Sequence, residues 1–161
     1  MKKTILLFNP RPDPNLKELY IPLALLCISR LLDRKGYHIK IVSGSLFNKP
    51  FEVLKDYAKT SYIFGVSSMT GYQIIGGLRA SELVKKINKN IKIVWGGWHA
   101  SVYPKQTLMN RYIDIVVKGP GERAFLAIVK RIEENKDLSG IPGVYWKNEG
   151  KIMVNTKRRL D

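Results

Sequence analysis

The residues best suited to hold a ligand follow an apolar run directly: two glycines, an aromatic side chain and an imidazole. Gly96 and Gly97 come after Ile91–Trp95, and Trp98 and His99 follow them. Two adjacent glycines remove every Cβ where a strand ends, so another molecule can approach the bare backbone. A tight turn that needs a positive φ is the alternative, and it is the commoner explanation of an isolated Gly-Gly. The surrounding chain must decide between them.

Short β-branched runs alternate with amphipathic segments along most of the chain. The runs are apolar on both faces, which is typical of strands in a parallel sheet covered by helices. We predict strands at residues 4–8, 39–42, 62–66, 91–95 and 113–117, and helices at residues 22–34, 51–59, 72–89, 104–111 and 122–134. Five strand-helix repeats predict an open, doubly wound α/β sheet with right-handed crossovers.

The periodicity of the predicted helices also predicts which side chains are buried. Cys27 lies among leucines in the first helix and is expected to be buried. Trp95, at the end of the fourth strand, is expected in the core. The long helix at 72–89 is expected to turn its apolar residues toward the sheet. These residues are Ile75, Leu78, Leu83, Val84 and Ile87.

The pattern changes after the fifth helix. Residues on both sides of Asn148-Glu149-Gly150 alternate between apolar and polar, which predicts a β-hairpin. We therefore expect three parts: a Rossmann-like domain over residues 1–140, a hairpin over residues 141–155 appended to it, and a linker or truncated end at residues 156–161.

The composition limits the classes of function. The 28 Lys and Arg against 13 Asp and Glu give a net charge of +15, which favours a nucleic-acid partner. The basic residues are spread along the chain without interleaved aromatics, so a solvated surface explains them better. A single cysteine excludes a disulfide framework and an iron-sulfur cluster held within this chain. Because no apolar run approaches the roughly 20 residues of a membrane span and no secretory signal is present, we expect a cytoplasmic protein with no membrane contact.

Small and hydroxylated residues follow two other predicted strands. The run Ser67-Ser68-Met69-Thr70 comes after the third strand, and Gly119 and Gly121 come after the fifth. Parallel strands of an open sheet end at one edge, so these residues should meet Gly96 and Gly97 in a groove for a large polar ligand. The run from Gly119 also matches a dinucleotide fingerprint, but that motif belongs in the first strand-helix unit.

Neither catalysis nor metal binding is expected of these residues. Ser67 and Ser68 have no base and acid at the spacing that a hydrolase requires. His99 could donate a hydrogen bond to a ligand, or it could cap its own loop through the backbone. Nothing near His99 completes a coordination sphere, so lining a pocket is the better interpretation. Asp114 precedes a strand and is expected to be a turn residue.

Several motifs, taken in order, carry a resemblance to a known family. They are Pro22–Leu26, Gly36–Ile39, Ser67–Thr70, Gly96–Ser101 with Pro104, Asp114–Glu122 and Ile141–Val144. Together they resemble the N-terminal cobalamin-binding domain of B12-dependent radical SAM enzymes, over nearly all 161 residues. The resemblance implies a flavodoxin-like strand order of 2-1-3-4-5 and a cobalamin whose nucleotide tail enters the edge of the sheet. It implies the following cofactor-binding residues: Ser67, Ser68, Met69, Thr70, Gly96, Gly97, Trp98, His99, Gly119 and Gly121.

This sequence departs from the family pattern in four places. The loop after the first strand holds Asp13 but no histidine, where many cobalamin domains carry Asp-x-His-x-x-Gly, so cobalt should lack a lower histidine ligand from that loop. Met69 stands in place of a leucine. The run Gly119–Glu122 has proline where the family has the first glutamate of Gly-Glu-Gly-Glu. The Cys-x-x-x-Cys-x-x-Cys motif of the radical SAM domain is absent.

The resemblance therefore implies a module without catalysis of its own. S-adenosylmethionine and a [4Fe-4S] cluster would be bound by a radical SAM domain, C-terminal in the parent enzyme or separate, that performs methyl transfer or related radical chemistry. Two other functions stay open. One is a cofactor-free docking or RNA-contacting domain of the same fold, and the other is a small flavin or nucleotide binder.

Overall fold

Within the part of the chain described by the computed structural model, residues 3–15, 17–33 and 35–156, seven strands form one sheet. They are β1 (Thr4–Asn9), β2 (His38–Ser43), β3 (Ser61–Ser67), β4 (Lys92–Gly96), β5 (Ile115–Val117), β6 (Val144–Asn148) and β7 (Lys151–Val154). The order is β2-β1-β3-β4-β5-β6-β7, and β1 to β5 are parallel. The predicted order 2-1-3-4-5 is thereby confirmed.

The C-terminal hairpin extends this same sheet. Strand β6 pairs antiparallel with β5, and β7 pairs antiparallel with β6. The hairpin is therefore confirmed as a structural element, while the division of the chain at residue 140 stays a prediction. Of the expected linker, residues 157–161 lie outside the described residues.

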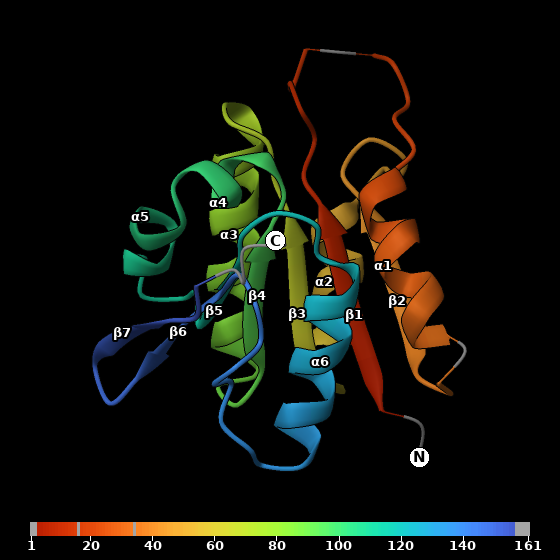
Figure 1. The fold of residues 1–161 in the computed structure, drawn as a ribbon. Coiled ribbons are helices and arrows are strands. Elements are labelled where there is room, and N and C mark those ends of the chain that lie inside the picture. Colours follow the sequence, from red (N-terminus) through yellow and green to blue (C-terminus); the bar gives the residue numbers. More distant parts are fainter. Residues whose placement is uncertain (1–2, 16, 34, 157–161) are drawn as a thin grey trace.

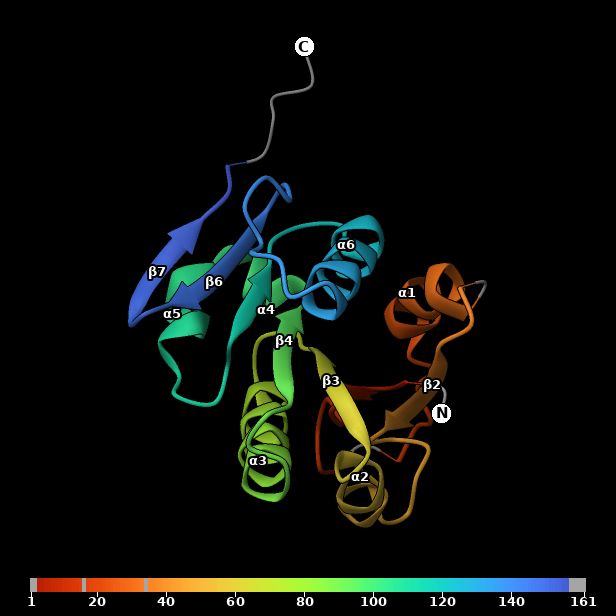
Figure 2. The same cartoon turned by 90° about the horizontal axis from the view of Figure 1, so that it is seen from below.

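Six helices of the described residues cover the sheet (Figure 1). They are α1 (Leu23–Asp33), α2 (Pro50–Ala58), α3 (Tyr72–Ile87), α4 (Trp98–Val102), α5 (Pro104–Met109) and α6 (Glu122–Glu133). Figure 2, a view from below, shows α1 and α6 on one side of the sheet and α2 and α3 on the other. None of the helices within the described residues is both long enough and apolar enough to cross a membrane.

Alternate residues of each strand pack against opposite helix layers. In β1, Ile5 and Leu7 join the cluster beneath α1 and α6, whereas Leu6 and Phe8 join the cluster against α2 and α3. All four side chains are buried. Because side chains alternate across a strand, burial on both faces requires the continuous apolar runs seen in the sequence.

Helix α3 buries only part of the face that its apolar residues suggest. Val84 is buried as predicted and Leu78 packs partly buried against the core, whereas Ile75 and Ile87 are exposed. The other buried residues of the helix are Gln73, Gly77, Ala80 and Ser81. The cause is Trp95, which is fully buried as predicted and fills the space between β4 and α3. A Cβ on Gly77 would lie 2.7 Å from the Trp95 ring, and the Trp95 Nε1 donates a hydrogen bond to the Ser81 hydroxyl at 3.0 Å. Only small residues fit beneath this indole.

The helices correct the expectation for Cys27 and include one short helix that was not predicted. Cys27 is exposed, because α1 buries Leu25 and Leu32 and turns Cys27 away from the sheet. The segment after Gly97 is helical, since α4 starts at Trp98 and is followed at once by α5. The predicted helix at 104–111 is thus the second of two short helices, and it ends at Met109.

Candidate functional site

A cavity of about 200 Å³ lies at the carboxyl edge of the sheet, between the strands and helices α1 and α6. Its walls come from the ends of β1, β3, β4 and β5, from the first turns of α1, and from the loop that leads into α6. The lining is almost entirely apolar, with Ser67 and Glu122 as its hydroxyl and carboxylate side chains. The lining residues are Leu7, Ala24, Leu25, Ile28, Gly65, Val66, Ser67, Val94, Trp95, Gly96, Gly97, Val117, Gly119, Pro120, Gly121, Glu122 and Phe125.

The cavity exists because small residues occupy one face of the central strands near their ends. Gly65 and Ser67 of β3 lie on the same face as Val94 and Gly96 of β4, with Gly65 paired to Val94 and Ser67 paired to Gly96. A Cβ on Gly96 would meet no atom within 4 Å, so it would enter open space. A Cβ on Gly65 would lie 2.7 Å from Leu7 and 3.3 Å from Phe125. The absent side chains therefore leave room between the sheet and the helices.

One serine ties together the two glycine-containing loops that border the cavity. The Ser101 hydroxyl donates a hydrogen bond to the Gly97 carbonyl at 2.7 Å and accepts one from the Gly119 N–H at 2.9 Å. Gly97 itself has φ 92° and ψ −171°, a backbone conformation that is essentially restricted to glycine. The end of β4 and the loop after β5 are thereby held in one arrangement.

A buried glutamine does the same for the loops after β1 and β3. The Gln73 Nε2 donates to the Pro10 carbonyl at 2.7 Å, and its Oε1 accepts from the Met69 N–H at 2.7 Å. In addition, the Asn9 Nδ2 donates to the Ser67 carbonyl at 3.1 Å. These loops beside the cavity have no regular secondary structure, and the hydrogen bonds of the two side-chain amides connect them instead.

An open groove of about 410 Å³ adjoins the cavity and shares Ala24, Leu25, Ser67 and Gly97 with it. Large apolar side chains stand exposed along this groove. Trp98 and Leu23 are each 67% exposed, and Ile21 and Met69 are more than half exposed. The arrangement of a narrow apolar cavity beneath a wide apolar rim suits a ligand with a flat large part and a smaller appended ring.

The structure brings most of the predicted site residues together. Gly96, Gly97, Gly119, Gly121 and Ser67 line the cavity, and Ser68, Met69 and Trp98 line the adjoining groove with Ser67 and Gly97. Thr70 is exposed in the turn before α3 and lines neither of them.

His99 lies apart from the cavity. As the second residue of α4 it faces a different surface depression, lined also by Leu78, Trp95 and Met109. Its Nδ1 is buried without a hydrogen-bond partner within the described residues, and burial lowers the pKa of the imidazole below its usual value. Its backbone N–H donates to the Ser68 carbonyl at 3.2 Å. The histidine thus contributes its backbone, and not its ring, to the frame of the site.

Several residues of the site were not singled out from the sequence. Leu25 and Ile28 of α1 and Phe125 of α6 close the cavity from the helix side, and Gln73 and Ser101 brace the loops. The burial of Gln73 depends on tertiary packing, so a glutamine near the start of a predicted helix gives no signal in the sequence. The apolar helix residues give none either, because they look like any other core positions.

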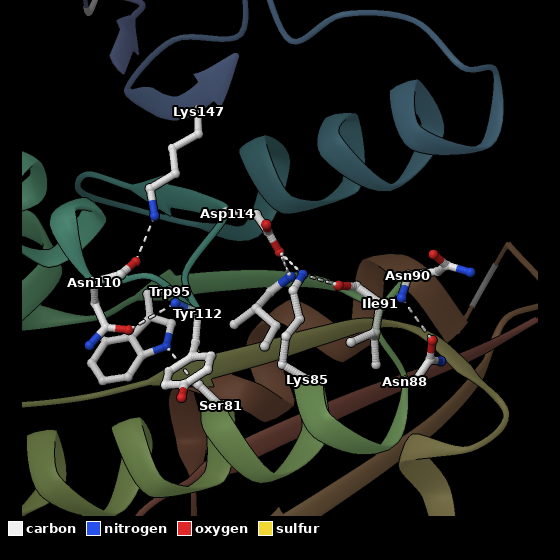
Figure 3. Close-up of polar contacts among 11 residues, drawn as sticks. Ser81, Lys85, Asn88, Asn90, Ile91, Trp95, Asn110, Tyr112, Asp114 and Lys147 are labelled. Carbon is white, nitrogen blue, oxygen red and sulfur yellow. Dashed lines mark hydrogen bonds and ion pairs between the residues drawn. The ribbon is translucent and has the colours of Figure 1, made fainter. Parts of the chain in front are cut away.

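A second polar cluster lies away from this edge and holds the fold together (Figure 3). The Asp114 carboxylate pairs with the Lys85 ammonium at 2.7 Å and accepts the Ile93 N–H at 2.8 Å, while Lys85 also donates to the Ile91 carbonyl. Close by, the Lys147 ammonium donates to the Asn110 carbonyl at 2.6 Å. Burial lowers the pKa of Lys147. The partners of Asp114 are Lys85 of α3 and the backbone of Ile93 in β4, which gives Asp114 a structural role.

Comparison with known proteins adds an independent finding. The family model of the B12 binding domain matches residues 15–129 of this chain. Among curated proteins, an uncharacterised methyltransferase from Pyrococcus horikoshii is 28% identical over 142 residues, which are 86% of this chain and 30% of that protein. The chain therefore spans less than a third of this relative.

Solved structures share the fold over nearly the whole chain. TsrM from Kitasatospora setae, a radical S-adenosylmethionine methyltransferase solved with tryptophan and an analogue of S-adenosylmethionine, has a TM-score of 0.80 at 21% identity. The match covers 97% of this chain and 30% of TsrM. OxsB, a cobalamin-dependent S-adenosylmethionine radical enzyme solved with aqua-cobalamin and S-adenosylmethionine, has a TM-score of 0.80 at 17% identity, covering 99% of this chain and 23% of OxsB.

Proposed function

The chain belongs to the B12-binding domain family, and from that premise we propose that it holds a cobalamin at the carboxyl edge of its sheet. The observation that carries the proposal is the cavity between the sheet, α1 and α6, bordered by Gly65, Gly96 and Gly119. In this proposal the nucleotide tail of the cofactor enters the cavity and the corrin ring lies over the adjoining groove.

The residues present fit such a ligand. The cavity is apolar and is open on the Gly96 side, where a Cβ would meet nothing. The Ser67 hydroxyl lies at the cavity and has no hydrogen-bond partner within the described residues. It is therefore available to donate to the tail. The exposed Met69 and Trp98 along the groove offer apolar contact to a large ring.

We propose further that the chain works as a module of a larger catalytic assembly. Cobalamin supplies a cobalt centre that can carry a methyl group, while this chain binds and orients the cofactor. Because the chain spans 30% or less of the enzymes described above, the partner proposed for it is a radical SAM domain with S-adenosylmethionine and a [4Fe-4S] cluster. Methyl transfer or a related radical reaction would take place there. The cytoplasm is the compartment proposed for it.

Titration with hydroxocobalamin, followed by visible absorbance, tests the binding. The informative variant is Gly96→Leu, whose side chain extends into the cavity without a positive φ or a Cβ clash. We expect saturable binding by the unmodified chain and at least a tenfold weaker affinity for Gly96→Leu. Lys92→Leu is the matched control, because Lys92 is the exposed first residue of the same strand.

The outcomes separate the candidate functions. Equal affinity of the Gly96→Leu variant and the unmodified chain places the ligand elsewhere and refutes the assigned site. A complete lack of binding by the folded chain, as judged from its circular dichroism, refutes the function. That result favours the cofactor-free docking or RNA-contacting domain, for which a salt-dependent shift with RNA is the matching test.

A further inference from the structure

The last strand of the sheet, β7, is an open edge away from the cavity described above. It pairs with β6 on one side and ends the strand order of the described sheet. Figure 1 and Figure 2 both show it at the outer margin of the molecule, beyond β6. None of its described residues, Lys151–Val154, lines the cavity or the adjoining groove. We propose that this edge is an interaction surface, on which β7 of a second copy of the chain pairs antiparallel with β7 of the first.

The side chains of β7 are exposed, unlike those at the other edge of the sheet. Ile152, Met153 and Val154 each expose 38% of their surface, whereas β2 at the opposite edge exposes only its first residue. Proteins commonly protect an edge strand with a proline, a bulge or charged side chains, because its free backbone groups can pair with another strand. Apart from Lys151 at its first position, β7 carries no such protection, since its other residues are apolar and its register with β6 is regular.

The hairpin fixes which backbone groups of β7 face outward. The Asn155 N–H donates to the Val144 carbonyl at 2.9 Å, so these two opposed residues form a hydrogen-bonded pair. Pairs with and without hydrogen bonds alternate along an antiparallel ladder. Met153 therefore turns its backbone groups toward β6, whereas Ile152 and Val154 turn theirs outward. Two N–H and two carbonyl groups are thus presented to another strand.

One antiparallel register between two copies satisfies all of these outward groups. If Ile152 lies opposite Val154 of the second copy, the two residues exchange both of their hydrogen bonds, and twofold symmetry repeats the pair. Met153 then lies opposite Met153 of the second copy, on the symmetry axis. A register shifted by two residues would place Met153 opposite Lys151 or opposite Asn155 instead. The symmetric register is the one in which all three apolar side chains meet apolar partners.

The distribution of charge is compatible with this pairing. The net charge of +15 makes two copies repel each other in general. In the symmetric register, however, Lys151 lies opposite the uncharged Asn155 of the second copy. The two Lys151 residues are then separated by roughly 13 Å along the strands, at a rise of about 3.3 Å per residue. This separation exceeds the screening length of about 8 Å at physiological ionic strength, so no close pair of like charges opposes the contact.

The small size of the contact predicts a weak association. Specific, stable interfaces bury more than about 1,000 Å², and a pair of strands of 4 residues falls short of this. We therefore expect a concentration-dependent dimer with a dissociation constant on the order of 0.1 mM. Added salt should strengthen it, because salt screens the repulsion between the two basic copies.

The symmetric position of Met153 provides the test, because a charge placed there meets the same charge on the second copy. Sedimentation equilibrium is measured for Met153→Asp, Met153→Lys and an equimolar mixture of the two. Each variant alone should self-associate about tenfold or more weakly than the unmodified chain, whereas the mixture should associate at least as tightly as the unmodified chain. Ile87→Asp and Ile87→Lys are the matched controls, since Ile87 is exposed to a similar fraction, 36%, at the end of α3. They should leave the association unchanged.

Amide hydrogen exchange of the unmodified chain gives a second readout that needs no variant. The N–H groups of Ile152 and Val154 should exchange severalfold more slowly at high protein concentration than at low concentration. The Met153 N–H, which is directed toward β6, should change less. Equal exchange of the Ile152 and Val154 N–H groups at both concentrations would overturn the inference.

The sedimentation results can also contradict the inference. A chain that stays monomeric at millimolar concentration overturns it. Self-association that the Met153 variants leave unchanged places the interface elsewhere and overturns it as well, as does a loss in both variants that mixing does not restore. The inference does not depend on cobalamin binding, because β7 lies outside the cavity and the groove. Titration with hydroxocobalamin therefore tests the proposed function separately.

Discussion

The same substitution should destabilise the protein strongly at Gly97 and hardly at all at the neighbouring Gly96. In Gly97→Ala the new Cβ would lie 2.7 Å from the Ser68 carbonyl oxygen, and φ 92° with ψ −171° is strained for any L residue. The strained backbone costs about 1–3 kcal/mol and the steric overlap a similar amount, so we expect roughly 2–6 kcal/mol of lost stability. In Gly96→Ala the Cβ meets nothing, φ is not positive, and stability should change by less than about 1 kcal/mol.

Urea unfolding followed by circular dichroism measures both changes on one scale. A typical domain has about 5–15 kcal/mol of stability, so the Gly97→Ala midpoint should fall clearly, whereas Gly96→Ala should stay close to the unmodified chain. Equal midpoints for the two variants would refute the assignment of backbone strain to Gly97. A large loss for Gly96→Ala would refute the open space beside β4.

Three further predictions concern residues around the site and the fold. Ser101→Ala removes the hydroxyl that accepts the Gly119 N–H, so cobalamin affinity should fall about fivefold or more, with a stability loss of roughly 1–2 kcal/mol in urea unfolding. Asp114→Asn removes the charge opposite Lys85 and should lower stability by about 1–2 kcal/mol while titration finds cobalamin affinity unchanged. Burial lowers the pKa of His99 in the folded state, so the unfolded chain takes up a proton at this residue first as the pH falls. The neutral His99 therefore contributes stability that is complete above about pH 6.5 and is lost as the pH falls below it. Urea unfolding of His99→Gln should show a weaker dependence on pH.

Exposed residues of the same types provide the controls for Ser101 and His99. Ser139→Ala changes an exposed loop serine and should leave cobalamin affinity intact, and an unchanged affinity for Ser101→Ala would contradict the bracing role. A loss of cobalamin binding by Asp114→Asn without loss of stability would contradict its structural role. His38→Gln removes the other, exposed histidine and is the control for His99→Gln. If the pH dependence of the unfolding free energy changed in His38→Gln and not in His99→Gln, that dependence would not come from His99.

The order of the elements, and the edge of the sheet at which the cavity lies, could be predicted from the sequence without its structure. Apolar runs at 4–8 and 62–66 predict strands buried on both faces, and parallel strands bring the segments that follow them to one edge. The glycines after β4 and β5 were found this way, because a missing Cβ is visible in a sequence whatever surrounds it. The hairpin was found because its alternation and its turn residues are local signals.

Tertiary packing alone decided which side chains turn toward the cavity. His99 lies two residues after Gly97, yet the start of α4 turns its ring away from the cavity and toward a different depression. The large Trp95 ring packs against Gly77 of α3, where a Cβ would overlap it, while Ile75 and Ile87 of that helix are exposed. Phe125 of α6 closes the cavity, although it lies nearly thirty residues after Gly97 in the chain. Such outcomes depend on the volumes of residues that are distant in sequence, and a periodic pattern within one helix does not contain that information.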